Sequence, residues 1–350
     1  MHPRHLFLVV AITLSSLTAC SGGGGSSAPA NYAGGGSGGN GTSAQGGNAG
    51  GGTATASPTP SSAPPLSNSG GQPAVPPAGQ IYLGAYVREG NGGSDATNIA
   101  LLESQVGRHM ALSLHYAGWT TPFGGADEVT DVQEGRIPVI SWQCGAPNAA
   151  VASGSQDANI GAHADELRAF GKPVFLRYDW EFNLTEGTNG RTACVDSAGL
   201  LGFFSPADFI AAWNHIHAIF AAHGANNVAF LWNPSGGRPN PPAAYYPGSA
   251  SVDWVGIDEY DRTDITFAQT YDLYPQVVGY NKPILITETA ANPEYQTTFL
   301  AAAGPSLQSL FPAVKGLIYF DAPGNFSWTL TPAGLGSFTA MGHLPYFSAK

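Results

Sequence analysis

The chain of 350 residues has few basic side chains and few cysteines for its length, and each shortage excludes a class of protein. It contains 13 Lys and Arg against 24 Asp and Glu, and three cysteines. Binding to nucleic acid or to an anionic membrane surface needs clustered Lys and Arg, so neither partner is expected. Three cysteines are too few for a small disulfide-stabilised scaffold. A single apolar run, near the N-terminus, resembles a membrane segment, so a multi-span membrane protein is not expected either.

The first twenty residues have the composition of an export signal. A short basic head that includes Arg4 precedes an apolar stretch at residues 6–17, which is too short to span a bilayer. The Leu-Thr-Ala-Cys that follows resembles the lipobox of bacterial lipoproteins. This resemblance implies a signal peptide over residues 1–19, lipidation of Cys20, and an anchor in the bacterial cell envelope, at the outer membrane or cell surface.

The next segment lacks charge altogether. Residues 21–79 contain 18 glycines, 8 prolines and no Asp, Glu, Lys or Arg. A segment with so few large apolar side chains cannot bury a core, so we expect residues 20–79 to be a disordered tether. As a flexible coil it would reach roughly 40 Å. All 24 acidic residues and every base except Arg4 follow it, which leaves residues 80–350 as one domain with a formal charge of −12.

Residues 80–350 alternate between predicted strands and predicted helices. Short apolar or β-branched runs bounded by Gly, Pro or polar residues predict strands, here at residues 81–87, 109–114, 137–142, 173–178, 228–232, 252–257, 283–287 and 314–320. Helical spacing and capping residues predict helices at 157–170, 207–223, 267–274 and 294–309. Eight strands with intervening helices over about 270 residues predict an α/β protein with a (β/α)8 TIM barrel. A doubly wound sheet is the alternative, but no glycine-rich phosphate loop follows the first strand.

Two predicted strands are followed by a glutamate. Glu181 follows the fourth strand and Glu288 comes directly after the seventh, and in a (β/α)8 barrel both positions face the same mouth. One carboxyl that is protonated and one that is ionised can together cleave a glycosidic bond. The alternative is that such glutamates cap helices or pair with arginine, but two of them at these strands favour catalysis.

The residues around these glutamates resemble glycoside hydrolase family 26, the β-mannanase family of retaining (β/α)8 enzymes. Arg177 and Asn183, with Glu181 between them, reproduce the family's Arg-x-x-His-Glu-x-Asn spacing, except that Trp180 replaces the histidine. Further matching segments lie at residues 232–234, 245–248, 252–258 and 282–289. The resemblance implies that Glu181 is the acid/base, that Glu288 is the nucleophile, and that Tyr260 donates a hydrogen bond to Glu288. It also implies a retaining endo-β-glycanase that acts on β-mannan or a related β-glucan.

Other residues near the predicted mouth are candidates for substrate binding. Besides Arg177 and Asn183 these are the aromatic side chains Tyr260, Trp119, Trp142, Trp180 and Trp328, together with His115. Buried aromatic side chains are more often core than sugar platforms. Four carboxyls compete with the assigned pair: Asp258, Glu259, Asp261 and Asp321. We expect neither a metal site nor a cofactor, because no suitable ligand spacing is present.

Cys144 follows the third strand and Cys194 lies in the loop after the fourth. Neighbouring barrel loops and an exported protein predict a disulfide between them, with two free thiols as the alternative. We expect a monomer. Two other functions stay open: a glycosidase for an acidic exopolysaccharide, for which Arg177, Arg191, Arg238 and Arg262 would meet uronates, and a non-catalytic carbohydrate-binding surface lipoprotein.

Overall fold

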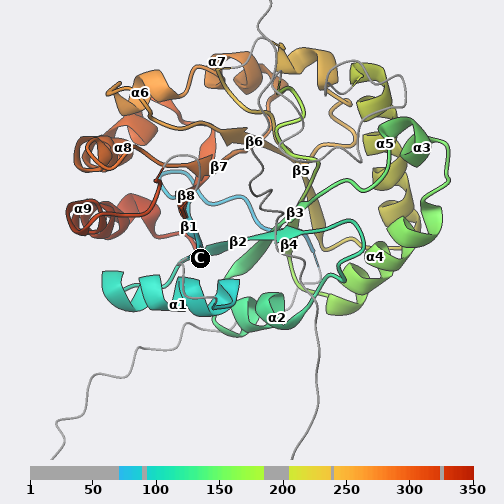
Figure 1. Ribbon diagram of the computed structural model, residues 1–350, viewed down its shortest axis with the longest axis horizontal. Coiled ribbons are helices and arrows are strands. Elements are labelled where there is room, and N and C mark those ends of the chain that lie inside the picture. Colours follow the sequence, from blue (N-terminus) through green and yellow to red (C-terminus); the bar gives the residue numbers. More distant parts are fainter. Residues whose placement is uncertain (1–70, 89–92, 185–204, 238–239, 324–326) are drawn as a thin grey trace, which may run out of the picture. The chain divides into compact units, whose positions relative to one another are not determined.

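A computed structural model of the protein describes residues 71–88, 93–184, 205–237, 240–323 and 327–350. The predictions for Cys20, Cys194, Arg191 and Arg238 lie outside these described residues. Parallel strands form a closed barrel in the order β1 to β8, and β8 pairs with β1 (Figure 1). The strands are β1 (Tyr82–Val87), β2 (Leu112–Ala117), β3 (Ile137–Trp142), β4 (Val174–Tyr178), β5 (Val228–Trp232), β6 (Trp254–Asp258), β7 (Ile284–Thr289) and β8 (Val314–Asp321). The predicted (β/α)8 barrel is confirmed.

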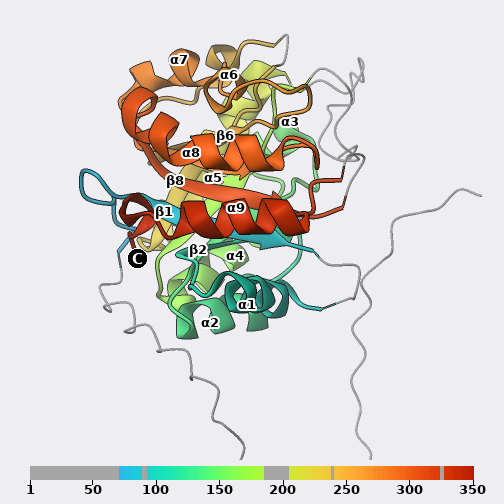
Figure 2. The same cartoon turned by 90° about the vertical axis from the view of Figure 1, so that its left-hand side faces the viewer.

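Helices surround this barrel. They are α1 (Asp95–Val106), α2 (Ala126–Gln133), α3 (Asn148–Ala152), α4 (Asp157–Phe170), α5 (Pro206–Ala222), α6 (Phe267–Thr270), α7 (Tyr274–Val277), α8 (Gln296–Leu310) and α9 (Pro332–Gly342). Short 3-10 helices cover Pro242–Tyr245, Val278–Tyr280 and Pro345–Phe347. Figure 2 shows α8 and α9 side by side on the outside of the strands.

The helix ends follow from local sequence. Ser205 caps α5 through its side chain and Pro206 occupies the first turn, as the sequence predicted. The single helix expected at residues 267–274 is two short helices, because Pro275 in α7 has no N–H to continue the α-helical bonding from α6. The sequence analysis did not identify α1, α2, α3 or α9.

The core has two layers, because alternate strand residues point to opposite faces. Leu114, Phe175 and Leu285 are among the side chains that fill the barrel interior. A larger apolar cluster lies between the strands and the helices. The parity of a residue, meaning whether it stands at an odd or an even position along its strand, therefore decides whether its side chain can reach the barrel interior and its mouth.

The second strand begins three residues later than expected. The prediction was residues 109–114, whereas β2 covers Leu112–Ala117. This shift places His115 and Tyr116 inside the strand, on opposite faces. It changes which of the two belongs to the site.

Residues 71–79 are attached to the barrel, although the sequence analysis assigned them to the tether. Nε2 of Gln72 donates to the carbonyl of Val228 at 2.9 Å, at the start of β5. Tyr82 Oη, at the start of β1, donates to the carbonyl of Ala74 at 2.7 Å. We call residues 71–79 the strap. It lies at the end of the barrel where the strands begin.

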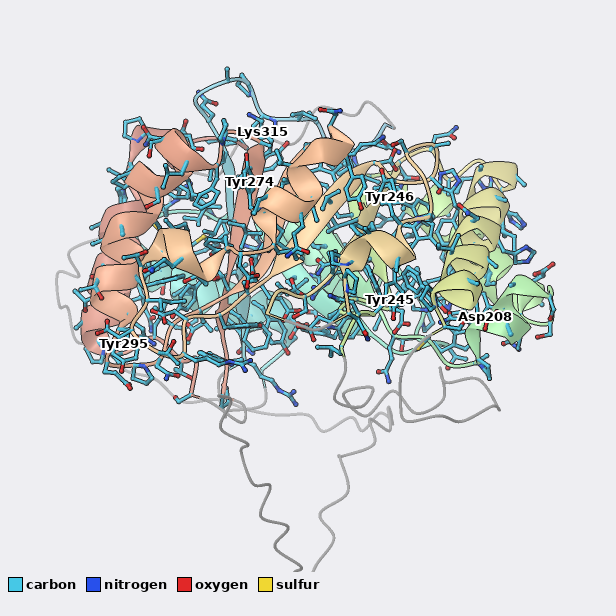
Figure 3. The ribbon with its side chains drawn as sticks, turned by 90° about the horizontal axis from the view of Figure 1, so that it is seen from above. Asp208, Tyr245, Tyr246, Tyr274, Tyr295 and Lys315 are labelled. Atoms are coloured by element: carbon cyan, nitrogen blue, oxygen red, sulfur yellow. The ribbon has the colours of Figure 1, made fainter. Side chains whose placement is uncertain are left out.

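The opposite end of the barrel is the mouth. In Figure 3, Lys315 near the start of β8 lies at one side of the molecule, while Asp208 and Tyr295 near the starts of α5 and α8 lie at the other. Helices in this fold begin where the preceding strands end, so the side of Asp208 and Tyr295 is the mouth. The loops that follow the strands form it.

Candidate active site

Glu288 lies at the mouth, near the end of β7, and its carboxyl group accepts hydrogen bonds on both oxygens. Tyr116 Oη donates to Oε1 at 2.5 Å, and Tyr260 Oη donates to Oε2 at 2.6 Å. The guanidinium of Arg177 also donates to Oε1. An ionised carboxylate accepts and does not donate, so three donors match this form of Glu288. The hydrogen bond from Tyr260 that the family resemblance implied is present.

Arg177 links side chains on four strands through its hydrogen bonds. It is fully buried in β4 and donates to Asp258 Oδ2 at 2.9 Å and to Ser141 Oγ at 2.6 Å, in addition to Glu288. Burial by itself would lower the pKa of Arg177, but the carboxylates of Glu288 and Asp258 outweigh this and raise it. The guanidinium is therefore a permanent cation between two acids.

Asp258 ends β6 next to Glu288 in the sheet register. Burial raises the pKa of Asp258 well above its usual range, and the charge of Glu288 raises it further, while Arg177 acts in the opposite direction. Two neighbouring carboxyls that share one cation do not both ionise easily. Asp258, which the sequence analysis left as a competitor, is thus bound to the same arginine as Glu288.

Glu181 is carried by an unusual backbone turn after β4. Asp179 and Glu181 both have left-handed backbone angles, with φ values of 47° and 56°. For residues other than glycine each costs about 1–2 kcal/mol, and such strain is common at functional sites. The N–H of Glu181 donates to the carbonyl of Asn233 at 2.8 Å, which connects this turn to the end of β5.

Asn183 stabilises the same turn. Its Nδ2 donates to the carbonyl of Ser235 at 2.8 Å, and its Oδ1 accepts from the Ser235 N–H at 2.9 Å. The side chain is 1% exposed. Its hydrogen bonds are thus made with the loop after β5, and they position Glu181 rather than present an amide to the mouth.

Glu181 lines a pocket at the mouth. Tyr260, which donates to Glu288, lines the same pocket. Burial raises the pKa of Tyr260 most, and the charges of Glu288 and Glu181 are among the further causes that raise it. The pocket has a volume of about 220 Å³ and is also lined by Asp258 and Tyr260. The barrel therefore places both predicted glutamates at the mouth.

Two of the predicted aromatic side chains adjoin these acids. The ring of Trp180 lies 5.1 Å from that of Tyr116, and the Arg177 guanidinium lies 5.2 Å from the Trp180 ring. Trp328 stacks on Tyr260 with a centroid distance of 4.7 Å. Trp180 and Trp328 thus border the two tyrosines that donate to Glu288.

The prediction that Trp142 is a sugar platform is wrong. Trp142 has the outward parity of β3 and is fully buried between the barrel and the helices. It stacks on Trp119 at 4.4 Å with an interplanar angle of 7°. One face of Trp119 is therefore covered as well, and its Nε1 donates to Gln156 Oε1 at 3.2 Å.

The prediction that His115 lines the mouth is also wrong. His115 points away from the barrel interior and is hydrogen-bonded to Asp131 and Asp95. Burial lowers its pKa, but these two acids outweigh burial and raise the pKa to about 10. Its neighbour Tyr116 has the inward parity and reaches Glu288. The alternation of Leu112, Leu114 and Tyr116 was the signal in the sequence that would have identified it.

The remaining candidates have other partners. Asp261 accepts from the backbone of Thr263 at 3.1 Å, and Asp321 accepts from the backbone of Leu330 at 2.8 Å. Cys144 forms a disulfide, and its predicted partner Cys194 lies outside the described residues. Within the described ranges, no cluster of three or more His, Cys, Asp or Glu could hold a metal ion, and no helix has the length and apolar character to cross a membrane.

The fold and the site together define a (β/α)8-barrel protein with a paired-glutamate mouth. A sequence model of the family described as "Glycosyl hydrolase family 26" matches residues 205–316, which include Tyr260 and Glu288. This match supports the resemblance that the motifs predicted, and with it a glycoside hydrolase.

Several known proteins are similar to this chain at low sequence identity. The chain is 25% identical over 286 residues to Endoglucanase H of Acetivibrio thermocellus, a match that covers 74% of this chain and 30% of that protein. It is 25% identical over 144 residues to Beta-1,3-xylanase TXYA of a Vibrio species, which covers 40% of this chain and 28% of that protein. The chain thus matches less than a third of the length of either relative. The structure of Bacillus subtilis mannanase man26 matches with a TM-score of 0.54 and 17% identity over 76% of this chain and 85% of that one, which shows a shared fold.

Proposed function

We propose that this protein is a retaining endo-β-glycanase in which Glu288 is the nucleophile and Glu181 the acid/base. The observation that carries the proposal is the set of donors on Glu288. Arg177, Tyr116 and Tyr260 hold an ionised carboxylate in one orientation at the mouth, where Glu181 also lies. A nucleophile needs this orientation, because attack on the anomeric carbon tolerates little misplacement.

The reaction then has two steps. In the first, Glu288 attacks the anomeric carbon while Glu181 protonates the departing glycosidic oxygen, so a covalent glycosyl-enzyme forms and the C–O bond breaks. In the second, the Glu181 carboxylate takes a proton from water, which attacks the same carbon and releases Glu288. The two inversions give a product with the β configuration of the substrate. The mechanism requires carboxyls about 5–5.5 Å apart, against about 6.5–9.5 Å for inversion.

We propose a β-mannan or a related β-glucan as the substrate. The names of the relatives support this class without choosing a sugar, because they include an endoglucanase, a β-1,3-xylanase and a mannanase. Release of reducing ends should be measured on β-mannan, mixed-linkage β-glucan, β-1,3-xylan and an acidic exopolysaccharide. Cleavage of the acidic polymer alone would contradict the proposed class, and no cleavage of any polymer would favour the non-catalytic alternative.

Glu181→Ala separates the two carboxyl roles. Removal of the acid should lower kcat on polysaccharide by about 10²–10⁴-fold. Turnover of aryl glycosides with good leaving groups should largely remain, because these groups leave without a proton. Added azide should then give a β-glycosyl azide, identified by NMR.

Glu134→Ala is the matched control for this experiment. Glu134 is an exposed carboxyl that follows α2, before β3 begins, at the end of the barrel opposite the mouth. This variant should have wild-type rates and give no azide product. An α-glycosyl azide from Glu181→Ala would contradict the assigned roles.

We also propose that the protein is exported and anchored in the bacterial envelope through Cys20. The composition of residues 1–20 supports this, with a basic head, an apolar stretch and the terminal Leu-Thr-Ala-Cys. Cys20→Ser should shift the protein from the membrane fraction to the soluble fraction, or leave an unprocessed precursor, when cell fractions are compared by immunoblot. Unchanged membrane attachment of a processed protein would refute the anchor.

A further inference from the structure

The end of β2 that carries Tyr116 is paired on one side only. The register between β1 and β2 ends at Ser113, which lies opposite Ala85. On its other side β2 pairs with β3 over its whole length. Residues 115–117 therefore have no partner in β1, all of which the structure describes. Their position on the β1 side has to be fixed by contacts other than the strand ladder.

The helix that follows β1 supplies these contacts. α1 lies against β2 and presents one acid near each of its own ends (Figure 2). Asp95 is in the first turn of α1, and its Oδ2 lies 3.3 Å from Nδ1 of His115. Glu103 is near the other end of α1, and its Oε1 accepts from the N–H of Met110, just before β2, at 2.7 Å. Both ends of β2 are thus bound to one helix.

His115 is also held from the side of α2. Its Nε2 is hydrogen-bonded to Oδ2 of Asp131. Oδ1 of Asp131 accepts from Nε of Arg136 at 2.7 Å, and Nη1 of Arg136 donates to Oε2 of Glu103 at 2.8 Å. All four side chains are buried, so water does not compete for these contacts. The chain of charges returns to α1, because Glu103 belongs to the same helix as Asp95.

Both ring nitrogens of His115 face a carboxylate oxygen. A carboxylate only accepts hydrogen bonds, so both nitrogens can donate at once only when the imidazole is protonated. Hydrogen bonds between an imidazolium and carboxylates are stronger than neutral ones. His115 therefore replaces the missing ladder to β1 with a charged contact to the helix that follows β1.

The orientation of Tyr116 depends on this contact. Tyr116 is the next residue along β2, and its side chain points into the barrel. There its Oη donates to Oε1 of Glu288 at 2.5 Å and accepts from Nη2 of Arg177 at 3.2 Å. A shift at the end of β2 would move this hydroxyl, and with it the Glu288 carboxylate, away from the geometry that attack requires.

We propose that His115 is a positioning residue for the nucleophile: bound to Asp131 and Asp95 outside the barrel, it holds the end of β2 so that Tyr116, inside the barrel, keeps Glu288 oriented. The inference rests on the proposed glycanase function. It adds to that function a set of buried charges that takes no part in either step of the reaction.

Two variants test this role through kcat and KM on the polysaccharide that the wild type cleaves. His115→Leu removes both contacts and should lower kcat by roughly 10- to 100-fold, the scale of a small misplacement of a reacting group, with KM changed less than about twofold. Asp95→Ala removes only the contact to α1, at a side chain that is 30% exposed, so it should fold even where His115→Leu does not. It should lower kcat by roughly 5- to 10-fold, and Asp95→Glu, which keeps a carboxylate, should restore kcat to within about twofold of wild type.

Tyr116→Phe separates positioning from a general structural effect. This variant keeps the ring and removes the hydroxyl that donates to Glu288. If His115 acts through that hydroxyl, Asp95→Ala should lower kcat by less than about twofold in the Tyr116→Phe background, because residues that act in one chain of contacts are not additive. The same fold loss in both backgrounds, or a lower melting temperature with unchanged kcat, would overturn the inference.

Asp157→Ala is the matched control. Asp157 also lies in the first turn of a helix, α4, and its Oδ1 lies 2.6 Å from Nε2 of His215. The control therefore removes the same kind of acid from a helix end and from a histidine, but neither residue lies on a barrel strand. Its kcat should equal that of the parent enzyme in both backgrounds. A wild type that cleaves no glycan would refute the proposed function itself, whereas additive losses in an active enzyme would refute only the role of His115.

Discussion

Glu288→Gln should lower kcat on every glycan substrate by about 10⁴-fold or more, the scale of removing a covalent nucleophile. The amide cannot form the glycosyl-enzyme. Its N–H group would also face Tyr116, Tyr260 and Arg177, which are themselves hydrogen-bond donors to this position. Substrates with good leaving groups should not recover, in contrast to the Glu181 variant, because their first step still needs the nucleophile. Rates should be measured on polymer and aryl glycoside with the same preparation.

The control for this variant is Glu134→Gln, which should keep the wild-type rate. The thermal unfolding of Glu288→Gln should be measured together with its rates, so that a loss of activity is not mistaken for a loss of fold. Activity of Glu288→Gln near the wild-type level would remove Glu288 from the mechanism and make Asp258 the next candidate.

Arg177→Met should be the most destabilising single change at the site. It would leave Glu288 and Asp258 adjacent and buried without their shared cation, and such a loss typically costs about 3–5 kcal/mol of unfolding free energy. One of the two carboxyls would then keep a proton, so activity should fall together with stability. Urea denaturation of the variant and the wild type, followed by fluorescence, measures the change in unfolding free energy.

Arg168→Met provides the comparison for this prediction. Arg168 pairs with Asp165 at 3.0 Å, but both side chains are about half exposed, so water replaces the contact. Its urea midpoint should be close to that of wild type. A similar small shift in Arg177→Met would show that the buried pair contributes little to stability.

Much of the site could be predicted because strand ends and residue parity fix it. Glu181 and Glu288 follow apolar runs whose ends must lie at one end of a barrel, and Arg177 lies two positions after inward-facing Phe175. The same parity argument would have excluded Trp142, which lies an odd number of residues from inward-facing Val139 in β3. The positions of the glutamates after predicted strands identified the mouth. The alternation of side chains along each strand decides which of them enter it.

Other features could not be predicted from the sequence. Strands of a parallel barrel are buried on both faces, so the apolar run from residue 109 to 117 did not show where β2 begins. The error of three residues hid Tyr116 and misplaced His115. Asp179 and Glu181 have left-handed backbone angles, although neither is a glycine, the residue that would indicate such angles in a sequence. Contacts with neighbouring segments hold this conformation, so the local sequence does not predict it. The long-range bonds of Arg177 depend on four strands at once.

The strap has a consequence for how the domain can work on a large polymer. Through Gln72 and Ala74 the chain reaches the barrel at the ends where β5 and β1 begin, whereas Glu181 and Glu288 lie where strands end. A polysaccharide chain laid across the mouth can therefore extend past the catalytic residues in both directions without meeting the strap. Any load carried by the N-terminal segment is applied to the base of the barrel, so pulling on it would strain Gln72 and Tyr82 before it moved a catalytic carboxyl.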